Sequence, residues 1–347
     1  MKRVIVMAGL LAAGAASAQE KGQIVADENI AKAVTGENKK PDGWDIGAEL
    51  GATFSFSNSN RVVGQPDGST IQLGVLFGAN ADLRAGQHEW QNSLTFNNTW
   101  SQSPQIDSFL KTVDNLELRT AYLYSLKSVP WLGPYARARL QTQVFNGWQV
   151  YGENRTFRVD GGDPQTLVAG DELDLTSAFE PLNLRQSAGA FARPWDSKTF
   201  SATFSLGVGA QEIFTSGGQV ITKEDGTFDD GNGNTLANVV EVVSLNDSVQ
   251  AGGELDVQLK GQTNKMFTWT FSANFLQPFY TDTDKDPTGK VLEGTELMNI
   301  EIMGKASVKL AEWASIDYVL TAKKIPLVLN DWQIQNGLLF STSFKLL

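Results

Sequence analysis

Charged residues that could bind, orient or exclude ions fall at regular places in this sequence. Four arginines come from neighbouring stretches, and most of the matching acids come from stretches far along the chain. Facing each other across an enclosed space, the two sets would create a transverse electric field or would join in a salt-bridge network. The residues are Arg119, Arg137, Arg139, Arg185, Glu254, Asp256, Glu301, Asp317, Asp45 and Glu49. Lys260, Lys305 and Lys309 stand among the acids, which favours the network, and both interpretations stay open.

Enzymatic chemistry has little support in the sequence. There is one histidine, His88, and no cysteine, which excludes disulfides and thiolate metal sites. A serine nucleophile would need a histidine base close by. His88 falls at a predicted short turn, where a solvated histidine is the simpler interpretation. We therefore predict no enzymatic activity and keep an outer-membrane hydrolase as the least favoured alternative.

Two acidic stretches are weak candidates for calcium binding. Calcium takes roughly six to eight oxygen ligands from flexible turns. Neither stretch has the full ligand spacing with a closing glutamate, so a solvated acidic loop, bridged by divalent ions to lipopolysaccharide, is the favoured interpretation. The acids are Asp225, Asp229 and Asp230 in the first stretch and Asp282, Asp284 and Asp286 in the second. No other cofactor is predicted.

All of these residues depend on alternating segments for their positions, and the clearest segment runs from Trp44 to Ser57. Every second residue from Trp44 to Phe56 is apolar, and the residues between are small or polar. A period of two indicates a strand with one apolar and one polar face. The length suits a membrane-spanning strand, which needs about nine to eleven residues. Twelve such segments are predicted, at 44–57, 70–83, 88–101, 115–126, 135–145, 184–192, 198–210, 248–260, 266–277, 297–310, 314–322 and 332–347.

Charge and loop length together favour a membrane barrel over a soluble sandwich or a lipocalin-like barrel. The apolar faces of the twelve segments carry no Asp, Glu, Lys or Arg. An Arg or Lys facing the middle of a bilayer costs about 2–4 kcal/mol. Short connections at 84–87, 127–134, 193–197, 261–265 and 311–313 alternate with long ones at 58–69, 102–114, 146–183, 211–247, 278–296 and 323–331. The predicted fold is an all-β transmembrane antiparallel up-and-down β-barrel of about twelve strands, with short periplasmic turns and long extracellular loops.

Tryptophan supports the same prediction, because bilayer interfaces select tryptophan at both rims. A soluble core would place some of these large apolar side chains centrally, and none of the nine falls in the middle of a segment. Those near the predicted periplasmic rim are Trp44, Trp90, Trp131, Trp195, Trp269 and Trp313, and those at or beyond the outer rim are Trp100, Trp148 and Trp332.

The start of the chain resembles an export signal. Lys2 and Arg3 precede an apolar run and a small-residue cleavage site, which predicts a signal peptide over 1–18 that is cleaved after Ala18. Residues 19–43 are expected to form a flexible periplasmic lead-in, and 44–347 the barrel. The formal net charge of −11 argues against nucleic-acid binding, which needs a basic surface. The expected location is the outer membrane of a Gram-negative bacterium.

Several short motifs resemble an uncharacterised family of Gram-negative outer-membrane barrels, known only as a domain of unknown function. The match is best over the first five predicted strands and fades after Gly147. The resemblance implies outer-membrane location and no known activity, and it carries no functional residues over. In one departure, the chain ends on Leu347, where such barrels usually end on an aromatic residue. The matching motifs lie at 43–45, 54–59, 90–94, 114–118 and 141–145.

The functional hypothesis from the sequence is a passive, porin-like channel for small solutes. The alternative is a structural or surface-interaction barrel with a closed lumen, in which 146–183 and 211–247 form a surface or enter the lumen. Expected partners are outer-membrane lipid, lipopolysaccharide and the barrel-assembly machinery. The oligomeric state is left open.

Overall fold

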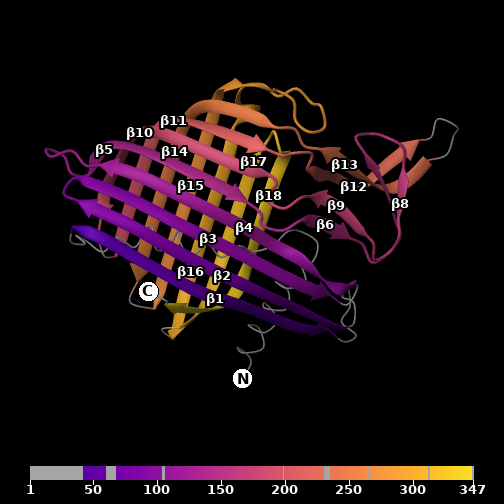
Figure 1. Ribbon diagram of the computed structural model, residues 1–347, viewed down its shortest axis with the longest axis horizontal. Coiled ribbons are helices and arrows are strands. Elements are labelled where there is room, and N and C mark those ends of the chain that lie inside the picture. The colour runs from indigo at the N-terminus through magenta and orange to yellow at the C-terminus, as the bar shows by residue number, and fades with distance from the viewer. Residues whose placement is uncertain are drawn as a thin grey trace, which may run out of the picture.

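Twelve antiparallel strands form a closed barrel in the computed structural model, which describes residues 42–59, 68–103, 106–197, 199–229, 235–263, 266–311 and 313–345 (Figure 1). The predicted fold class is confirmed, and each of the twelve predicted segments is a barrel strand. The predicted signal peptide and the lead-in up to residue 41 lie outside the described residues. In wall order the strands are β1 (Gly43–Ser59), β18 (Leu329–Lys345), β17 (Ala314–Ile325), β16 (Asn299–Ala311), β15 (Phe267–Thr281), β14 (Ser248–Thr263), β11 (Phe200–Phe214), β10 (Leu182–Asp196), β5 (Leu132–Thr142), β4 (Ile106–Tyr124), β3 (His88–Ser103) and β2 (Gly68–Ala85).

The two rims of the barrel differ. We call the rim that carries the start of β1 and the end of β18 the proximal rim, and the opposite one the distal rim. The connections at 143–181, 215–247 and 282–298 all lie at the distal rim. The predicted long connections 102–114 and 323–331 are wrong, because only 104–105 separate β3 from β4 and only 326–328 separate β17 from β18. Bulges in both hairpins interrupt the alternation, so the sequence pattern ends before the strands do.

Two of the distal connections fold into small sheets of their own, which project from one end of the barrel (Figure 1). We call these sheets, residues 147–176 and 219–244, the distal module. Its core consists of Leu167, Leu173, Val240 and Val242. The module also includes residues 239–244, which lie just before barrel strand β14 in the sequence. Its strands are β12 (Gln219–Asp229), β13 (Thr235–Ser244), β7 (Arg155–Val159) and β8 (Gln165–Leu167) in one sheet, and β6 (Gly147–Val150) and β9 (Glu172–Thr176) in the other.

A turn at the base of the distal module separates β13 from barrel strand β14. The Asp247 side chain accepts a hydrogen bond from the Thr215 backbone N–H at 2.7 Å, and the Leu245 N–H donates to the Gly218 carbonyl. The chain therefore changes direction before β14 begins. As a result β13 pairs with β12 and runs parallel to β7, away from the barrel wall.

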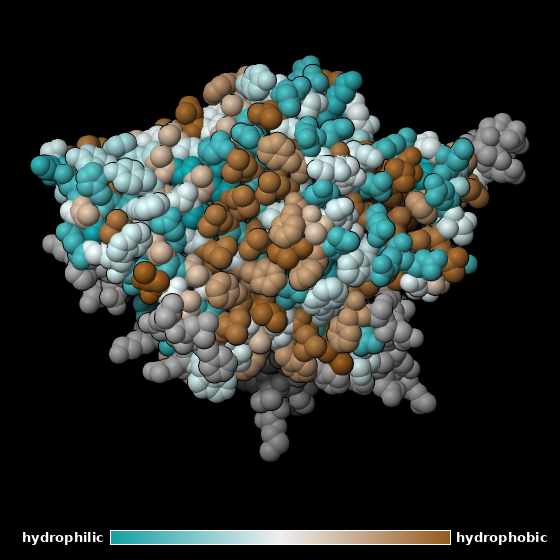
Figure 2. All heavy atoms as spheres, in the orientation of Figure 1, coloured by the Kyte–Doolittle hydropathy of each residue, from teal (hydrophilic) through white to brown (hydrophobic). Residues whose placement is uncertain are grey.

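The barrel wall is apolar on its outside and polar on its inside. Leu206 and Val208 on β11 point outward with 66% and 59% of their surface exposed. Figure 2 shows apolar side chains gathered in a broad patch over the wall that faces the viewer. The inward residues are buried although they are polar, as for Glu254 and Asp317 at 1% exposure each. Water would favour the reverse arrangement, so the outer face is built for hydrocarbon.

Helical structure is nearly absent from the described residues. They contain one short 3-10 helix, η1 (Gly294–Leu297), in the connection between β15 and β16. No helix among them is long and apolar enough to cross a membrane.

The tryptophans lie at the strand ends where the sequence placed them. Six are exposed and the other three pack in aromatic groups: the ring of Trp269 lies 6.3 Å from that of Phe200, and the ring of Trp100 lies 5.9 Å from that of Trp148. Their contact with lipid headgroups remains a prediction. The exposed six are Trp44, Trp90, Trp131, Trp195, Trp313 and Trp332.

The junction between the first and last strands is the shortest in the wall. β1 pairs with β2 along its whole length, but among the described residues it pairs with β18 only from Glu49 to Thr53. The two backbones approach closely there, since a side chain at Gly51 would meet the Thr342 carbonyl oxygen. Beyond Thr53, β1 continues toward the distal rim without a described partner on this side.

Candidate functional site

The barrel encloses a cavity of about 850 Å³. Its lining begins with Asp45 and Asp82 near the proximal rim and ends with Thr112 and Gln333 near the distal rim. The cavity therefore extends along most of the length of the barrel. The predicted charged residues that line it are Arg119, Arg137, Arg139, Arg185, Glu254, Asp256, Glu301 and Asp45.

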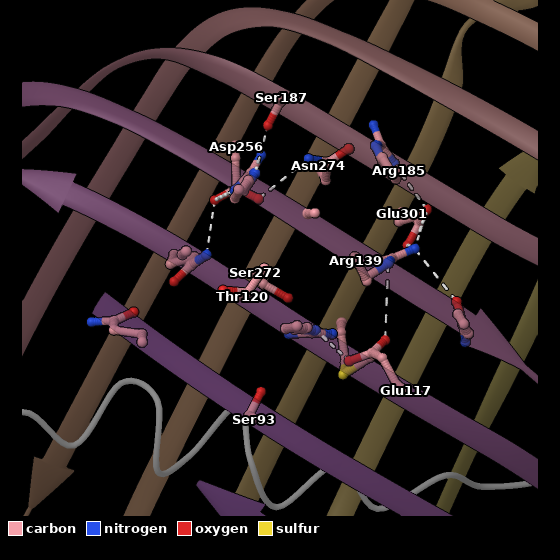
Figure 3. A pocket seen from close by; sticks show the side chains of 18 of the residues that line it. Ser93, Glu117, Thr120, Arg139, Arg185, Ser187, Asp256, Ser272, Asn274 and Glu301 are labelled. Atoms are coloured by element: carbon pink, nitrogen blue, oxygen red, sulfur yellow. Dashed lines mark hydrogen bonds and ion pairs between the residues drawn. The ribbon is translucent and has the colours of Figure 1, made fainter. Parts of the chain in front are cut away.

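One group of charges in the cavity is centred on Arg137, and we call it the proximal tier. Arg137 on β5 forms ion pairs with Glu254 at 2.6 Å and with Asp256 at 3.1 Å, both on β14. Its Nε donates to the Ser187 hydroxyl, and the Asn274 amide donates to Glu254. Figure 3 shows Ser187, Asp256 and Asn274 converging on this point. Because β10 and β11 stand between β5 and β14, these pairs cut across the curve of the wall.

A second group lies closer to the distal rim and is centred on Glu301 of β16. Glu301 forms ion pairs with Arg139 of β5 at 2.8 Å and with Arg185 of β10 at 3.0 Å. Arg139 also lies 3.9 Å from Glu117, which pairs in addition with Arg119. Figure 3 shows Arg139 and Arg185 directed at Glu301. Four strands separate β5 from β16 in the wall, so this group bridges the lumen.

Lys323 on β17 completes this second group, which we call the distal tier. Lys323 is the register partner of Glu301 and lines the same cavity. Lys323 was not among the predicted lumen residues, because the predicted strand ended at 322. Continuing the inward positions from Asp317 in steps of two would have reached it. The members of the distal tier are Glu117, Arg119, Arg139, Arg185, Glu301 and Lys323.

The charges in the lumen were expected to form either a transverse electric field or a salt-bridge network. The arginines do come from one part of the wall, and their acids come from a distant part of it, except Glu117, which lies on the same strand as Arg119. They are joined at ion-pair distance, so the arrangement is a network across the lumen. Such a network narrows the passage and fixes the side chains, because a buried charge stays favourable only while its partners are in place. Solutes that pass would meet alternating donors and acceptors in both tiers.

The remaining predicted lumen residues lie outside the two tiers. Asp317 pairs with Lys305 at 3.6 Å on the neighbouring strand. Asp45 lines the proximal part of the cavity, and Glu49 is buried at the junction of β1 and β18. The structure therefore brings together seven of the ten predicted residues and leaves these three apart.

The predicted calcium ligands that the structure describes, Asp282, Asp284 and Asp286, form no metal-binding group. Asp286 accepts hydrogen bonds from the Thr288 hydroxyl, the Lys290 backbone N–H and the Asn330 amide. Asp282 accepts one from the Val249 N–H. The described part of the chain holds no group of three or more acids and histidines placed to bind a metal. Asp230 and the side chains of Asp225 and Asp229 lie outside the described residues, and Asp284 joins no such group.

His88 lies among aromatic side chains at the proximal rim. The residue begins β3. Its Nδ1 forms a hydrogen bond with the Tyr122 hydroxyl, and its ring lies 5.1 Å from the ring of Tyr124.

A closed antiparallel barrel with an apolar outer face and a charged lumen is the architecture of outer-membrane β-barrel proteins. Residues 55–148 match the family model described as "Protein of unknown function (DUF3078)". This match confirms the resemblance inferred from the first five strands, and it ends where those motifs fade. No curated protein matches the chain.

Three solved structures illustrate the likeness in architecture. The COG4313 outer membrane channel from Pseudomonas putida F1 is 10% identical, with 89% of this chain and 98% of that one covered and a TM-score of 0.37. The translocator domain of the autotransporter NalP from Neisseria meningitidis is 8% identical, with 91% and 92% covered and a TM-score of 0.38. The monoaromatic hydrocarbon channel TodX, as a deletion mutant, is 10% identical, with 94% and 96% covered and a TM-score of 0.37.

Proposed function

We propose that this protein is a passive outer-membrane channel for small polar solutes, narrowed by the two charged tiers. The observation that carries the proposal is the cavity, which is lined by polar residues from near one rim to near the other. The proposal includes cleavage of the signal peptide after Ala18, insertion by the barrel-assembly machinery, contact with lipid and lipopolysaccharide, and no enzymatic activity.

The ion pairs of the two tiers would limit the size and the charge of the solutes that such a channel admits. Arg139 and Glu301 meet at 2.8 Å in the lumen, so a large solute would have to break an ion pair to pass. A small solute would pass between the fixed donors and acceptors, which would sort it by charge and dipole. Uncoupling this pair should therefore widen the passage without changing the net charge of the lumen.

Single-channel recording in planar bilayers tests the proposal. The wild-type protein should give discrete conductance steps, and the double variant Arg139→Gln/Glu301→Gln should give larger ones. Lys290→Gln is the matched control, because its partner Glu296 lies in an exposed distal connection, outside the lumen. Heat-modifiable migration of each variant would check that its barrel is folded.

The second candidate is a barrel whose lumen stays closed. The bridging of the lumen by Arg139 and Glu301 favours this candidate specifically. If neither the wild-type protein nor the uncoupled variant gives steps, the channel proposal fails and the closed barrel remains.

A further inference from the structure

Three arginines form a row across adjacent strands of the lumen wall. Arg139 on β5 is the register partner of Arg119 on β4 and also of Arg185 on β10. Like charges directly opposite each other destabilise a sheet. The row therefore destabilises the barrel wall unless negative groups in the lumen lie beside it.

Cations outnumber carboxylates around Glu301. Arg139 and Arg185 form ion pairs with Glu301, and Lys323 is its register partner, so three cations face this one carboxylate. The next acids lie farther away, with Glu117 at 3.9 Å from Arg139 and Glu254 at 3.5 Å from Arg185. At this level the lumen is therefore suited to an anion.

Arg185 supplies an unused donor at the same place. Its side chain is only 6% exposed, and its Nη1 donates to Glu301. Its Nη2 is buried without a hydrogen-bond partner in the protein, and its Nε lies 3.5 Å from Glu254 without a hydrogen bond. Leaving a buried donor unsatisfied costs about 1–3 kcal/mol, and more for a charged group. A ligand oxygen would remove that cost.

We propose that the distal tier is a binding subsite for a small oxyanion, a carboxylate or a phosphate, held by Arg139, Arg185 and Lys323. Guanidinium groups suit this ligand, since their planar donors match carboxylate and phosphate oxygens in pairs. The inference rests on the proposed channel for the route by which the anion arrives. It names the class of solute that the channel would favour.

Binding to the purified full-length barrel in detergent tests the subsite without any conductance measurement. Succinate and inorganic phosphate are titrated calorimetrically at constant ionic strength, and putrescine serves as the cationic probe. The wild-type protein should bind at least one of the two anions saturably and should not bind putrescine. The tighter anion shows which oxyanion the site prefers.

Three variants locate the binding. Arg185→Gln and Lys323→Gln should each weaken binding about tenfold or more, because each removes a charged hydrogen-bond donor. Arg84→Gln is the matched control: Arg84 also lines the cavity, but it pairs with Glu89 near the proximal rim. Its affinity for the anion should equal that of the wild type. Lys323→Gln keeps the test decisive if Arg185→Gln does not fold, since it leaves both ion pairs of Glu301 in place.

The possible outcomes separate this inference from the channel proposal. Saturable, variant-sensitive binding without conductance steps overturns the channel and supports the subsite. Conductance without saturable anion binding overturns the subsite and supports the channel. An equal loss of affinity in Arg84→Gln, or equal binding of putrescine, also overturns the subsite, because either result would indicate unspecific attraction.

Discussion

Side chains alternate between two unlike faces along the strands of both the barrel and the distal module, but the face that is enclosed differs between them. In the barrel the enclosed residues are polar, as Glu254 is, and the outward ones are apolar, as Leu206 is. In the module the enclosed residues are apolar, and Val240 and Val242 have no exposed surface. A period of two therefore identifies a strand with two unlike faces, while the surrounding medium decides which face is covered. The contrast places hydrocarbon around the barrel and water around the module.

The largest expected effect is the loss of stability of the distal module when a charge is placed in its core. Val240→Asp would bury a carboxylate among aliphatic side chains, and an uncompensated buried charge costs about 3–5 kcal/mol. We expect residues 147–176 and 219–244 to lose protection from hydrogen exchange while the barrel keeps its heat-modifiable migration. Lys223→Asp on the exposed side of β12 is the control and should retain protection. Unchanged protection in Val240→Asp would contradict a core of this kind.

The second largest expected effect is a loss of barrel stability when a charge is placed on the outer face. Leu206→Arg would place a charge against the bilayer interior and should lower the free energy of unfolding by about 2–4 kcal/mol. Denaturant titration of the protein in lipid vesicles measures this loss. Leu206→Phe, which keeps the position apolar, should change stability little. A Leu206→Arg barrel as stable in vesicles as the wild type would show that lipid does not touch this face.

The smallest effect concerns the connection between β15 and β16, which is water-facing like the module. Burial tends to raise the pKa of Asp286, but hydrogen bonds from Thr288, Asn330 and the Lys290 N–H outweigh it and hold the pKa below its ordinary value. The ionised carboxylate therefore stabilises this connection above the ordinary pKa of aspartate, and the stabilisation is lost as pH falls through the lowered value. Asp286→Asn should cost about 1 kcal/mol near neutral pH.

Hydrogen exchange over residues 282–298, followed as pH is lowered, measures that contribution. The difference between Asp286→Asn and the wild type should shrink toward acid pH. Asp284→Asn is the matched control, because Asp284 is exposed and its carboxylate makes no described hydrogen bond. A difference that is constant across pH would rule out the carboxylate as its source.

The barrel strands could be predicted because two media constrain every residue of them. Lipid excludes charge from one face and the lumen accepts it on the other, so the pattern survives in the sequence without any knowledge of partners. The pattern fails at the bulges beside Trp100 and Lys323, where one extra residue moves the following side chains to the other face. For that reason the predicted strands ended too early, and Lys323, which lies one residue beyond the predicted end of its strand, was not included.

The candidate site was predictable as a set of residues and not as a set of pairs. Inward charges follow from the alternation alone. Which arginine meets which acid depends on the curvature of the wall and on the side-chain reach, as for Arg139 and Glu301 on strands separated by four others. The module was missed for a different reason: its strands are short, and β13 pairs in parallel with a strand about eighty residues earlier.

The brief contact of β1 with β18 has a mechanical consequence. The other neighbouring strands of the wall are paired over longer stretches, whereas among the described residues the ring is closed only between Glu49–Thr53 and Ser341–Lys345. Force or heat applied to the folded cylinder should therefore part it along this line first and leave a curved, still hydrogen-bonded sheet. The same line is the last to be joined when the chain first becomes a cylinder.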